Sequence, residues 1–392
     1  MWIPSDSQEL ERLINDRALE ESTNLDFKGE LPSSSKELAK DVAAMANDGG
    51  TLVFGVGEDS TGHPAILQPF RLYGAAERVS SMIYSSLAEP PKVEIRTLPS
   101  KQDPEVGYLA VVIPASPRAP HMVVVKGDNR FYGRAAKGNM PLNEGEVARL
   151  YQRRHQWEQD RDAHLDQVVS DMALEPSTNY GYLYMFARPV FPSPSRLAEL
   201  GDRNAQSSVL SQMIVDVARP NVYHNQFSPD FSSGSFKPIA AGWRVFMAGE
   251  RSGPDPMRTL DLEIHFDCEV RLVLGRAAEM LEGQLVLFEK GLAQNVIRCL
   301  TLSGRLYQKV RYFGAVDVGL AVIGIQGSIA YGARSGHTGY WTKFDQSTFR
   351  ETARVMSSQL EMEAPSVAQS LLNRLFHASG AVGHFDPFRI GG

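Results

Sequence analysis

The chain has 392 residues, and because one hydrophobic core rarely grows past about 250 residues, the length predicts two domains. Apolar residues make up 43% and charged residues 22%, which excludes wholesale disorder. The net charge of −6 excludes a generally basic coat for nucleic acid, although a local basic face is compatible with it.

The first part of the sequence alternates helix and strand patterns. In chain order, the predicted elements are a helix over 5–20, a strand over 24–31, a helix over 36–47, a buried strand over 51–56, a helix over 72–88, strands over 92–98 and 107–114, a hairpin over 122–125 and 130–134, and a helix over 143–155. Ser5 or Asp6 is expected to cap the first helix. Ser34 with Glu37 predicts a capping box for the second.

The second part of the sequence is mixed. A densely charged run, Arg153 to Ala163, is the predicted linker, which gives domains over 1–155 and 156–392. Predicted strands beyond it are 180–187, 243–248, 260–274 and 318–325, and predicted helices are near 204–218, 291–306, 347–362 and 365–377. We therefore expect an α+β protein whose second domain is of unknown type.

The cysteine spacing and the hydropathy of the chain predict its redox state and its compartment. Cys268 and Cys299 have no CxxC spacing, which excludes a cysteine-ligated zinc site and predicts two reduced core thiols. The N-terminus is charged rather than apolar, and the most apolar late segment, 315–331, is too short and polar to span a bilayer. We expect a cytoplasmic protein without membrane contact.

The most informative side chains are acids near the N-terminus. Asp26 and Lys28 are two apart on a predicted strand and so share a face, while Glu58 and Asp59 follow the next strand. If those strands are neighbours, Glu21, Asp26 and Glu58 converge at one edge. Three carboxylates suit Mg²⁺ or Mn²⁺, and a nearby lysine suits a phosphate. The alternative is a solvated face and charged turns.

The spacing sets a condition on this site. Glu21 and Asp26 are five apart, so a continuous strand would place them on opposite faces. Glu21 must therefore lie in the turn before the strand, with Glu20 as the alternative ligand.

A basic set follows between residues 118 and 154. It contains Arg118, Lys126, Arg130, Arg134, Lys137, Arg149, Arg153 and Arg154, with His121, Phe131 and Tyr132 interleaved. Cations among aromatic rings suit a surface that holds phosphates and stacks bases. The residues expected to bind nucleic acid are Lys126, Arg130, Tyr132, Arg134 and Lys137; the alternative is a hairpin surface that is basic by chance.

Other motifs indicate no chemistry. The glycines at 55, 57 and 62 have the wrong spacing for a dinucleotide loop, and no P-loop is present. Residues 332–339 are predicted to form a loop. His265 and Asp267, on one face of a predicted strand, are expected to be a hydrogen-bonded surface couple.

Two stretches resemble a known family. The run from Glu21 to Lys28 (ESTNLDFK) and the run from Leu38 to Val56 (LAKDVAAMANDGGTLVFGV) are similar to the Schlafen-type AlbA-like domain. That pattern opens with E-x4-E/D-F-K and continues with a helix ending in A-N-x-x-G-G and a strand ending in G-V. Phe131 to Arg134 resembles its Y-x-R hairpin, and the helix from Glu144 to Arg154 resembles its closing segment, so the likeness covers about residues 8–155.

The resemblance implies an α/β domain that binds nucleic acid. Some Schlafen members are metal-dependent endoribonucleases that act on structured RNA such as tRNA through three acids, which here fall on Glu21, Asp26 and either Glu58 or Asp59. Asp26 stands where glutamate is commoner. Many bacterial members are named as regulators or ATP-binding proteins, but no nucleotide motif supports ATP here.

Two functional hypotheses result. The first is a metal-dependent endonuclease for RNA, with Glu21, Asp26, Lys28 and Glu58 catalytic and Glu21, Asp26, Glu58 and Asp59 as ligands for Mg²⁺ or Mn²⁺. The alternative is a non-catalytic regulator that binds RNA or DNA and in which the acids are structural. The second domain would sense a signal or form a homo-oligomer, in a hypothetical phage-defence role.

Overall fold

The computed structural model describes residues 2–135, 138–175, 177–219, 229, 231, 234–247, 259–332 and 342–380. The chain divides into two compact units, Met1–Glu158 and Gln159–Gly392. With 36% helix and 33% strand, the protein has the α+β fold that the sequence predicts. Among the described helices, none is long and apolar enough to cross a membrane.

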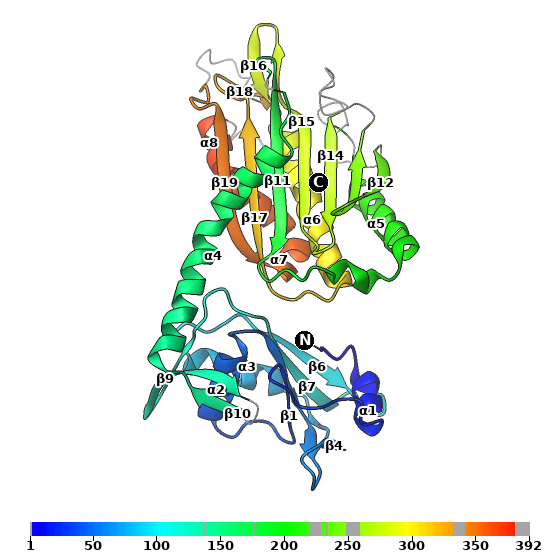
Figure 1. The fold of residues 1–392 in the computed structure, drawn as a ribbon, viewed down its shortest axis with the longest axis vertical. Helices are drawn as coiled ribbons and strands as arrows, with labels where there is room; N and C mark the ends of the chain where they lie inside the picture. The colour runs from blue at the N-terminus through cyan, green and yellow to red at the C-terminus, as the bar shows by residue number, and fades with distance from the viewer. Residues whose placement is uncertain are drawn as a thin grey trace. The chain divides into compact units, whose positions relative to one another are not determined.

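The first unit follows the predicted alternation of helix and strand (Figure 1). Its elements are α1 (Ser7–Asn15), β1 (Leu25–Lys28), α2 (Ser35–Met45), β2 (Gly50–Phe54), β3 (Val56–Glu58), β4 (Pro64–Leu67), β5 (Phe70–Arg71), α3 (Ala75–Ser86), β6 (Glu94–Pro99), β7 (Val106–Ile113), β8 (Met122–Val125), β9 (Asp128–Ala135), β10 (Gly138–Pro141) and the first half of α4 (Glu144–Asp171).

The core of this unit is one sheet covered on both faces. Its strands run β1-β2-β7-β5, with β6 also on β7, and β2 is parallel to β1 but antiparallel to β7. All five residues of β2 are buried, as its apolar run predicts for a central strand. Because side chains alternate along β1, Leu25 and Phe27 pack beside α1, whereas Asp26 and Lys28 point to the opposite face, on the side of α2.

The two predicted helix caps have different outcomes. Asp6 caps α1 by accepting the N–H of Glu9, as predicted. The capping box expected at Ser34 is wrong, because the side chain of Ser34 makes no cap bond and Glu37 pairs with Lys40 at 2.9 Å. The helix predicted over 5–20 ends at Asn15.

The run predicted as the linker, Arg153 to Ala163, is helical, and the division between the two units falls within it, after Glu158. Residues 153–163 lie inside α4, which runs unbroken from Glu144 to Asp171. Dense charge does not interrupt a helix, because Arg, Gln and Glu are good helix formers and the run contains neither Gly nor Pro. Acids in the second half of the helix pair with the sheet of the second unit, through Asp160–Arg188, Asp162–Thr352, Asp166–Arg350 and Asp171–Arg271.

The second unit is a large, mostly antiparallel sheet with helices on both faces (Figure 1). Its strands run β12-β13-β14-β15-β11-β17-β19, with β16 on β15 and β18 on β16. The strands are β11 (Tyr180–Pro189), β12 (Ser235–Ile239), β13 (Gly242–Phe246), β14 (Leu260–His265), β15 (Val270–Leu281), β16 (Gln284–Leu287), β17 (Ala315–Ile323), β18 (Ile329–Ala330) and β19 (Thr348–Met356). The helices are η1 (Arg196–Leu200), α5 (Arg203–Ala218), α6 (Glu289–Lys309), α7 (Ser357–Met362) and α8 (Ala364–Ala378).

The two faces of this sheet have separate cores. Helices α5, α6 and α8 bury the large core on one face. On the other face, Leu165, Val168 and Met172 of α4 pack against Tyr184 and Phe186 of β11. The second half of α4 is therefore part of the second unit's fold.

Three predictions about this unit have clear outcomes. Cys268 and Cys299 are both free and buried, as expected. The helix predicted over 347–362 is wrong for most of its length, since β19 occupies Thr348–Met356. The single strand predicted over 260–274 is two strands, separated by a turn in which Cys268 has a φ of +69°.

Candidate nucleic-acid interface and the Asp26 cluster

Asp26 is the buried centre of a polar group, which we call the Asp26 cluster: Glu21, Asp26, Lys28, Asp41, Arg134 and Asn139. Asp26 is only 3% exposed. Its Oδ1 accepts a hydrogen bond from Lys28 Nζ at 2.7 Å, and its Oδ2 accepts one from Arg134 Nη1 at 2.9 Å. The carboxylate that sequence reasoning assigns to a metal is therefore paired with two cations of its own domain.

Glu21 lies in the turn before β1, as the spacing required. Its Oε1 accepts the backbone N–H of Phe27 at 2.9 Å. Burial raises the pKa of Glu21, and the neighbouring Asp26 carboxylate raises it further against the opposing hydrogen bond from Phe27. Burial lowers the pKa of Lys28, but its hydrogen bond to Asp26 and the charges of Asp26, Asp41 and Glu21 together outweigh this and raise the pKa.

Two members of the cluster were missed by sequence reasoning. Asp41 of α2 lies 3.8 Å from Arg134 Nη1, and its Oδ1 accepts a hydrogen bond from Asn139 of β10 at 2.6 Å. Burial raises the pKa of Asp41, as does the nearby Asp26. The available signal was one acid in the otherwise apolar end of a helix, since residues 42–46 are all buried.

Glu58 and Asp59 do not join the cluster. Glu58 is the exposed last residue of β3, which pairs with β4 rather than extending the sheet. Asp59 binds within the turn that follows, and hydrogen bonds from Thr61 and His63 hold its pKa at about 2. Among the described residues, the one set of three His, Cys, Asp or Glu ligand atoms within 4.8 Å of one another lies in the second unit.

The Asp26 cluster gathers part of the predicted three-acid metal site. Two of its acids, Glu21 and Asp26, are adjacent, but the third predicted ligand is elsewhere and Lys28 and Arg134 occupy the oxygens of Asp26. A cation would have to displace at least one of these pairs.

The residues predicted to bind nucleic acid divide into exposed and buried ones. Lys126 and Arg130 are exposed, and no described residue forms an ion pair with either. Tyr132 is 5% exposed and donates its hydroxyl hydrogen to Asp128 at 2.7 Å, so it cannot stack on a base. Arg134 belongs to the Asp26 cluster. Lys137 lies outside the described residues.

An aromatic pair lies on the face of the hairpin opposite Tyr132. Phe131 of β9 meets Tyr151 of α4 edge to face, with ring centroids 6.1 Å apart, and Tyr151 is 46% exposed. Sequence reasoning missed Tyr151 because only the packing of α4 against the hairpin brings it there. We call Lys126, Arg130, Phe131 and Tyr151 the hairpin surface.

Most other bases of the predicted set already have partners. Arg153 donates to the Asn47 carbonyl and to Asp48, and Arg154 pairs with Glu89. Arg118 is 3.8 Å from the same Glu89 carboxylate. The basic surface of this unit is therefore smaller than the sequence suggests.

Comparison with known proteins identifies the first unit. The family model of the Schlafen AlbA_2 domain matches residues 21–143, a range that holds all of the Asp26 cluster and the hairpin. Residues 21–143 form a Schlafen-type AlbA-like domain. This Schlafen-type domain indicates nucleic-acid binding, with RNA or DNA as the partner.

The remaining comparisons add less. A solution NMR structure of the N-terminal domain of a protein related to the ATP-dependent DNA helicase RecG, from Nitrosomonas europaea, is 20% identical over 36% of this chain and 93% of that chain, with a TM-score of 0.27. No curated protein shows significant similarity to the chain.

Proposed function

We propose that the Schlafen-type domain binds RNA or DNA through the hairpin surface. The observation that carries this proposal is Arg130, an exposed cation of β9 without an acidic partner among the described residues. A guanidinium or ammonium group that is not neutralised within the protein is free to release counterions from a phosphate backbone. On the other face of the same strand, Phe131 contacts Tyr151, whose ring is 46% exposed and offers a stacking platform for a base.

The contrast between Arg130 and Arg134 supports this assignment. The two are four residues apart on β9, but the side chain of Arg134 is 10% exposed and contacts Asp26. Binding a phosphate with Arg134 would leave Asp26 buried beside one cation fewer. Binding a phosphate with Arg130 would break no ion pair among the described residues.

Fluorescence anisotropy with labelled tRNA, single-stranded RNA and duplex DNA tests the proposal. Arg130→Ala and Tyr151→Ala should each weaken binding about 5- to 100-fold, the range for losing a phosphate contact or a stacking platform. Lys101→Ala removes an exposed lysine in the turn between β6 and β7 and serves as the matched control. The proposal fails if Lys101→Ala weakens binding as much as Arg130→Ala.

We propose metal-dependent cleavage of structured RNA such as tRNA as a second function. One observation favours it: Glu21, Asp26 and Asp41 all lie around Lys28, and the pKa values of Glu21 and Asp41 are raised by this crowding and by burial. The three carboxylates of the cluster exceed its two cations, Lys28 and Arg134, by one negative charge, which favours a metal cation beside a bound substrate. Lys28 would then contact the phosphate. A nuclease of this kind would suit a phage-defence role.

Incubation of the full chain with labelled tRNA, with Mg²⁺ or Mn²⁺ and with chelator, tests cleavage separately from binding. Glu21→Gln keeps the hydrogen bond to Phe27 but removes the charge, so it should abolish cleavage and retain binding. If the wild-type chain leaves tRNA, single-stranded RNA and DNA intact in both metals, the second function is wrong and the first stands.

A further inference from the structure

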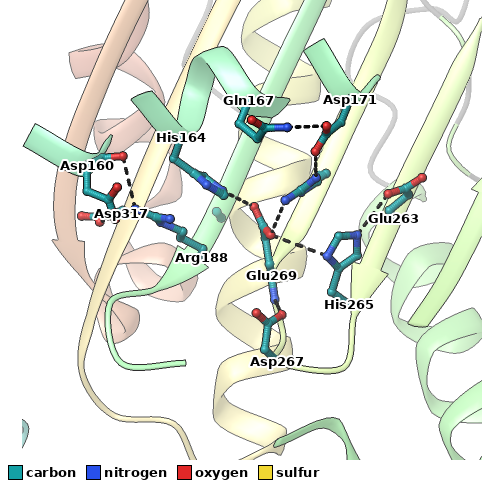
Figure 2. Close-up of polar contacts among 12 residues, drawn as sticks. Asp160, His164, Gln167, Asp171, Arg188, Glu263, His265, Asp267, Glu269 and Asp317 are labelled. Carbon is teal, nitrogen blue, oxygen red and sulfur yellow. Dashed lines mark hydrogen bonds and ion pairs between the residues drawn. The ribbon is translucent and has the colours of Figure 1, made fainter. Parts of the chain in front are cut away.

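A second group of titratable side chains lies in the second unit, outside the Schlafen-type domain. It is built on the turn between β14 and β15, where His265, Asp267 and Glu269 each offer a ligand atom within 4.8 Å of the others. Glu263 of β14 and His164 of α4 complete this group, which we call the Glu269 cluster. Figure 2 shows Glu269 between the imidazoles of His164 and His265.

The hydrogen bonds fix which nitrogen of His265 carries hydrogen. Its Nε2 lies 3.0 Å from Glu263 Oε2, and a contact of this length with a carboxylate requires an N–H donor. In neutral imidazole, Nδ1 then carries a lone pair, and it faces Glu269 Oε2 at 3.6 Å. Glu269 Oε2 also pairs with Arg271 Nη2 at 2.9 Å, so an ion in this gap would share that oxygen with the guanidinium.

The charge balance points the same way. Arg271 pairs with two carboxylates, those of Asp171 and Glu269, while Glu263 pairs with His265 and Asp267 accepts the backbone N–H of Glu269. Four carboxylates therefore lie in and around this group with one guanidinium. Glu269 is 4% exposed, so its own charge is little screened by water.

The arrangement also has the outer shell of a metal site. A metal-bound histidine commonly donates its other N–H to a carboxylate, which fixes its orientation and raises its basicity, and Glu263 is in that position. The gap between His265 Nδ1 and Glu269 Oε2 is close to the spacing of about 3.3 Å between donors that share an ion at about 2.1 Å. Asp267 supplies a third donor at the partly exposed rim of the turn.

We propose that His265, Asp267 and Glu269 bind a first-row transition-metal dication such as Zn²⁺. One imidazole nitrogen with carboxylate oxygens favours this class of ion over Mg²⁺ or Ca²⁺, which prefer oxygen alone. Since His164 of α4 is hydrogen-bonded to Glu269, the ion would also strengthen the attachment of α4 to the sheet.

Titration of the chelator-stripped full chain with Zn²⁺, and with Co²⁺ as a visible probe, tests the proposal. About one equivalent should bind, Co²⁺ should give a d–d absorption band, and a thousandfold excess of Mg²⁺ should not displace it. His265→Gln and Asp267→Asn should each weaken binding at least tenfold. Both variants conserve local bonds, since glutamine can still donate to Glu263 and asparagine can still accept the N–H of Glu269.

Matched controls separate this site from other ligands. His63→Gln changes an exposed histidine beside Asp59, and Glu21→Gln changes the Asp26 cluster; neither should alter the Co²⁺ band. If the stripped wild-type chain binds neither Zn²⁺ nor Co²⁺ at micromolar concentration, the excess charge is balanced by protons and the proposal is wrong. It is equally wrong if His265→Gln and Asp267→Asn bind as wild type.

Discussion

The two units each hold a buried acidic cluster, and the clusters differ in how their charge is balanced. In the Asp26 cluster, three carboxylates are matched by two cations, Lys28 and Arg134. In the Glu269 cluster, together with the neighbouring Asp171 and Arg271, four carboxylates lie with one guanidinium. The Asp26 cluster is close to neutral with its own cations, whereas the Glu269 cluster relies on positive charge from its imidazoles or from a bound ion.

This difference shows why acid spacing alone is a weak guide to metal binding. The sequence drew attention to the N-terminal acids, but the fold places an arginine from a distant hairpin against Asp26. The pair His265 and Asp267 was expected to be a surface couple, yet Glu269 and Glu263 join it at a turn. Which cluster can accept a cation depends on the partners that the fold supplies.

The largest expected effect comes from removing one cation of the Asp26 cluster. Arg134→Ala leaves Asp26 buried with one partner fewer, so the free energy of unfolding should fall by about 3–5 kcal/mol. Arg130→Ala, on the same strand but exposed, should change it by about 0.5 kcal/mol or less. Urea unfolding of the full chain measures both. Equal effects would show that the Arg134–Asp26 pair is not a structural one.

The next-largest effect comes from removing the guanidinium that pairs with Glu269. Arg271→Met removes the one guanidinium beside Glu269 and should destabilise the second unit by about 3 kcal/mol in the presence of chelator. Because a dication would replace the lost charge, Zn²⁺ should restore more stability to this variant than it adds to wild type. Thermal unfolding with and without Zn²⁺ measures this. Arg134→Ala, in the first unit, is the control and should not respond to Zn²⁺. If Zn²⁺ restores no stability to Arg271→Met, the proposed difference between the two clusters is contradicted.

A third test uses a buried ionisable group with no charged partner of its own. His121 is 2% exposed, hydrogen-bonded through Nδ1 to the Glu89 carbonyl, and burial lowers its pKa to about 4. As pH falls below about 6.5, the unfolded chain takes up the proton before the folded one, so stability is present above that pH and lost toward pH 4.

Between about pH 7 and pH 5, wild type should therefore lose about 2 kcal/mol through this group, and His121→Gln should not. The measurement is urea unfolding of both proteins at the two pH values, taken as a difference so that other titrating groups cancel. Parallel pH profiles for the two proteins would mean that His121 is not held neutral.

The smallest effect compares a cap that forms with one that does not. Asn143 and Glu146 bond reciprocally at the start of α4, with both distances at 2.9 Å. Asn143→Ala should cost about 1 kcal/mol, whereas Ser34→Ala should cost little because Ser34 makes no cap bond. Thermal unfolding compares the two. The reverse order would contradict the assignment of these helix ends.

Local patterns predicted much of the first unit's fold. The apolar run of β2 identified a central strand, and the period of two along β1 placed Asp26 and Lys28 on one face, where they are in contact. Patterns failed where distant packing decides the outcome. Dense charge did not reveal that the run from Arg153 to Ala163 is helical, because the arginines that pair with the acids of α4 lie far away in the chain.

The candidate sites depend even more on packing between residues that are far apart in the chain. The requirement that Glu21 lie in a turn followed from spacing, and it holds. That Arg134 reaches Asp26, 108 residues away, and that Tyr151 reaches Phe131, depend on how the hairpin and α4 pack. No local pattern carries that information.

The salt dependence of RNA binding tests the central claim most directly. Because counterions are released by cations that contact phosphates, the affinity of the wild-type chain for labelled tRNA should fall steeply as salt rises. In a Lys126→Ala, Arg130→Ala double variant, the slope of log affinity against log salt should be smaller by about 2. A flat wild-type response, or the same slope in both proteins, would contradict the assignment of the hairpin surface as the nucleic-acid interface.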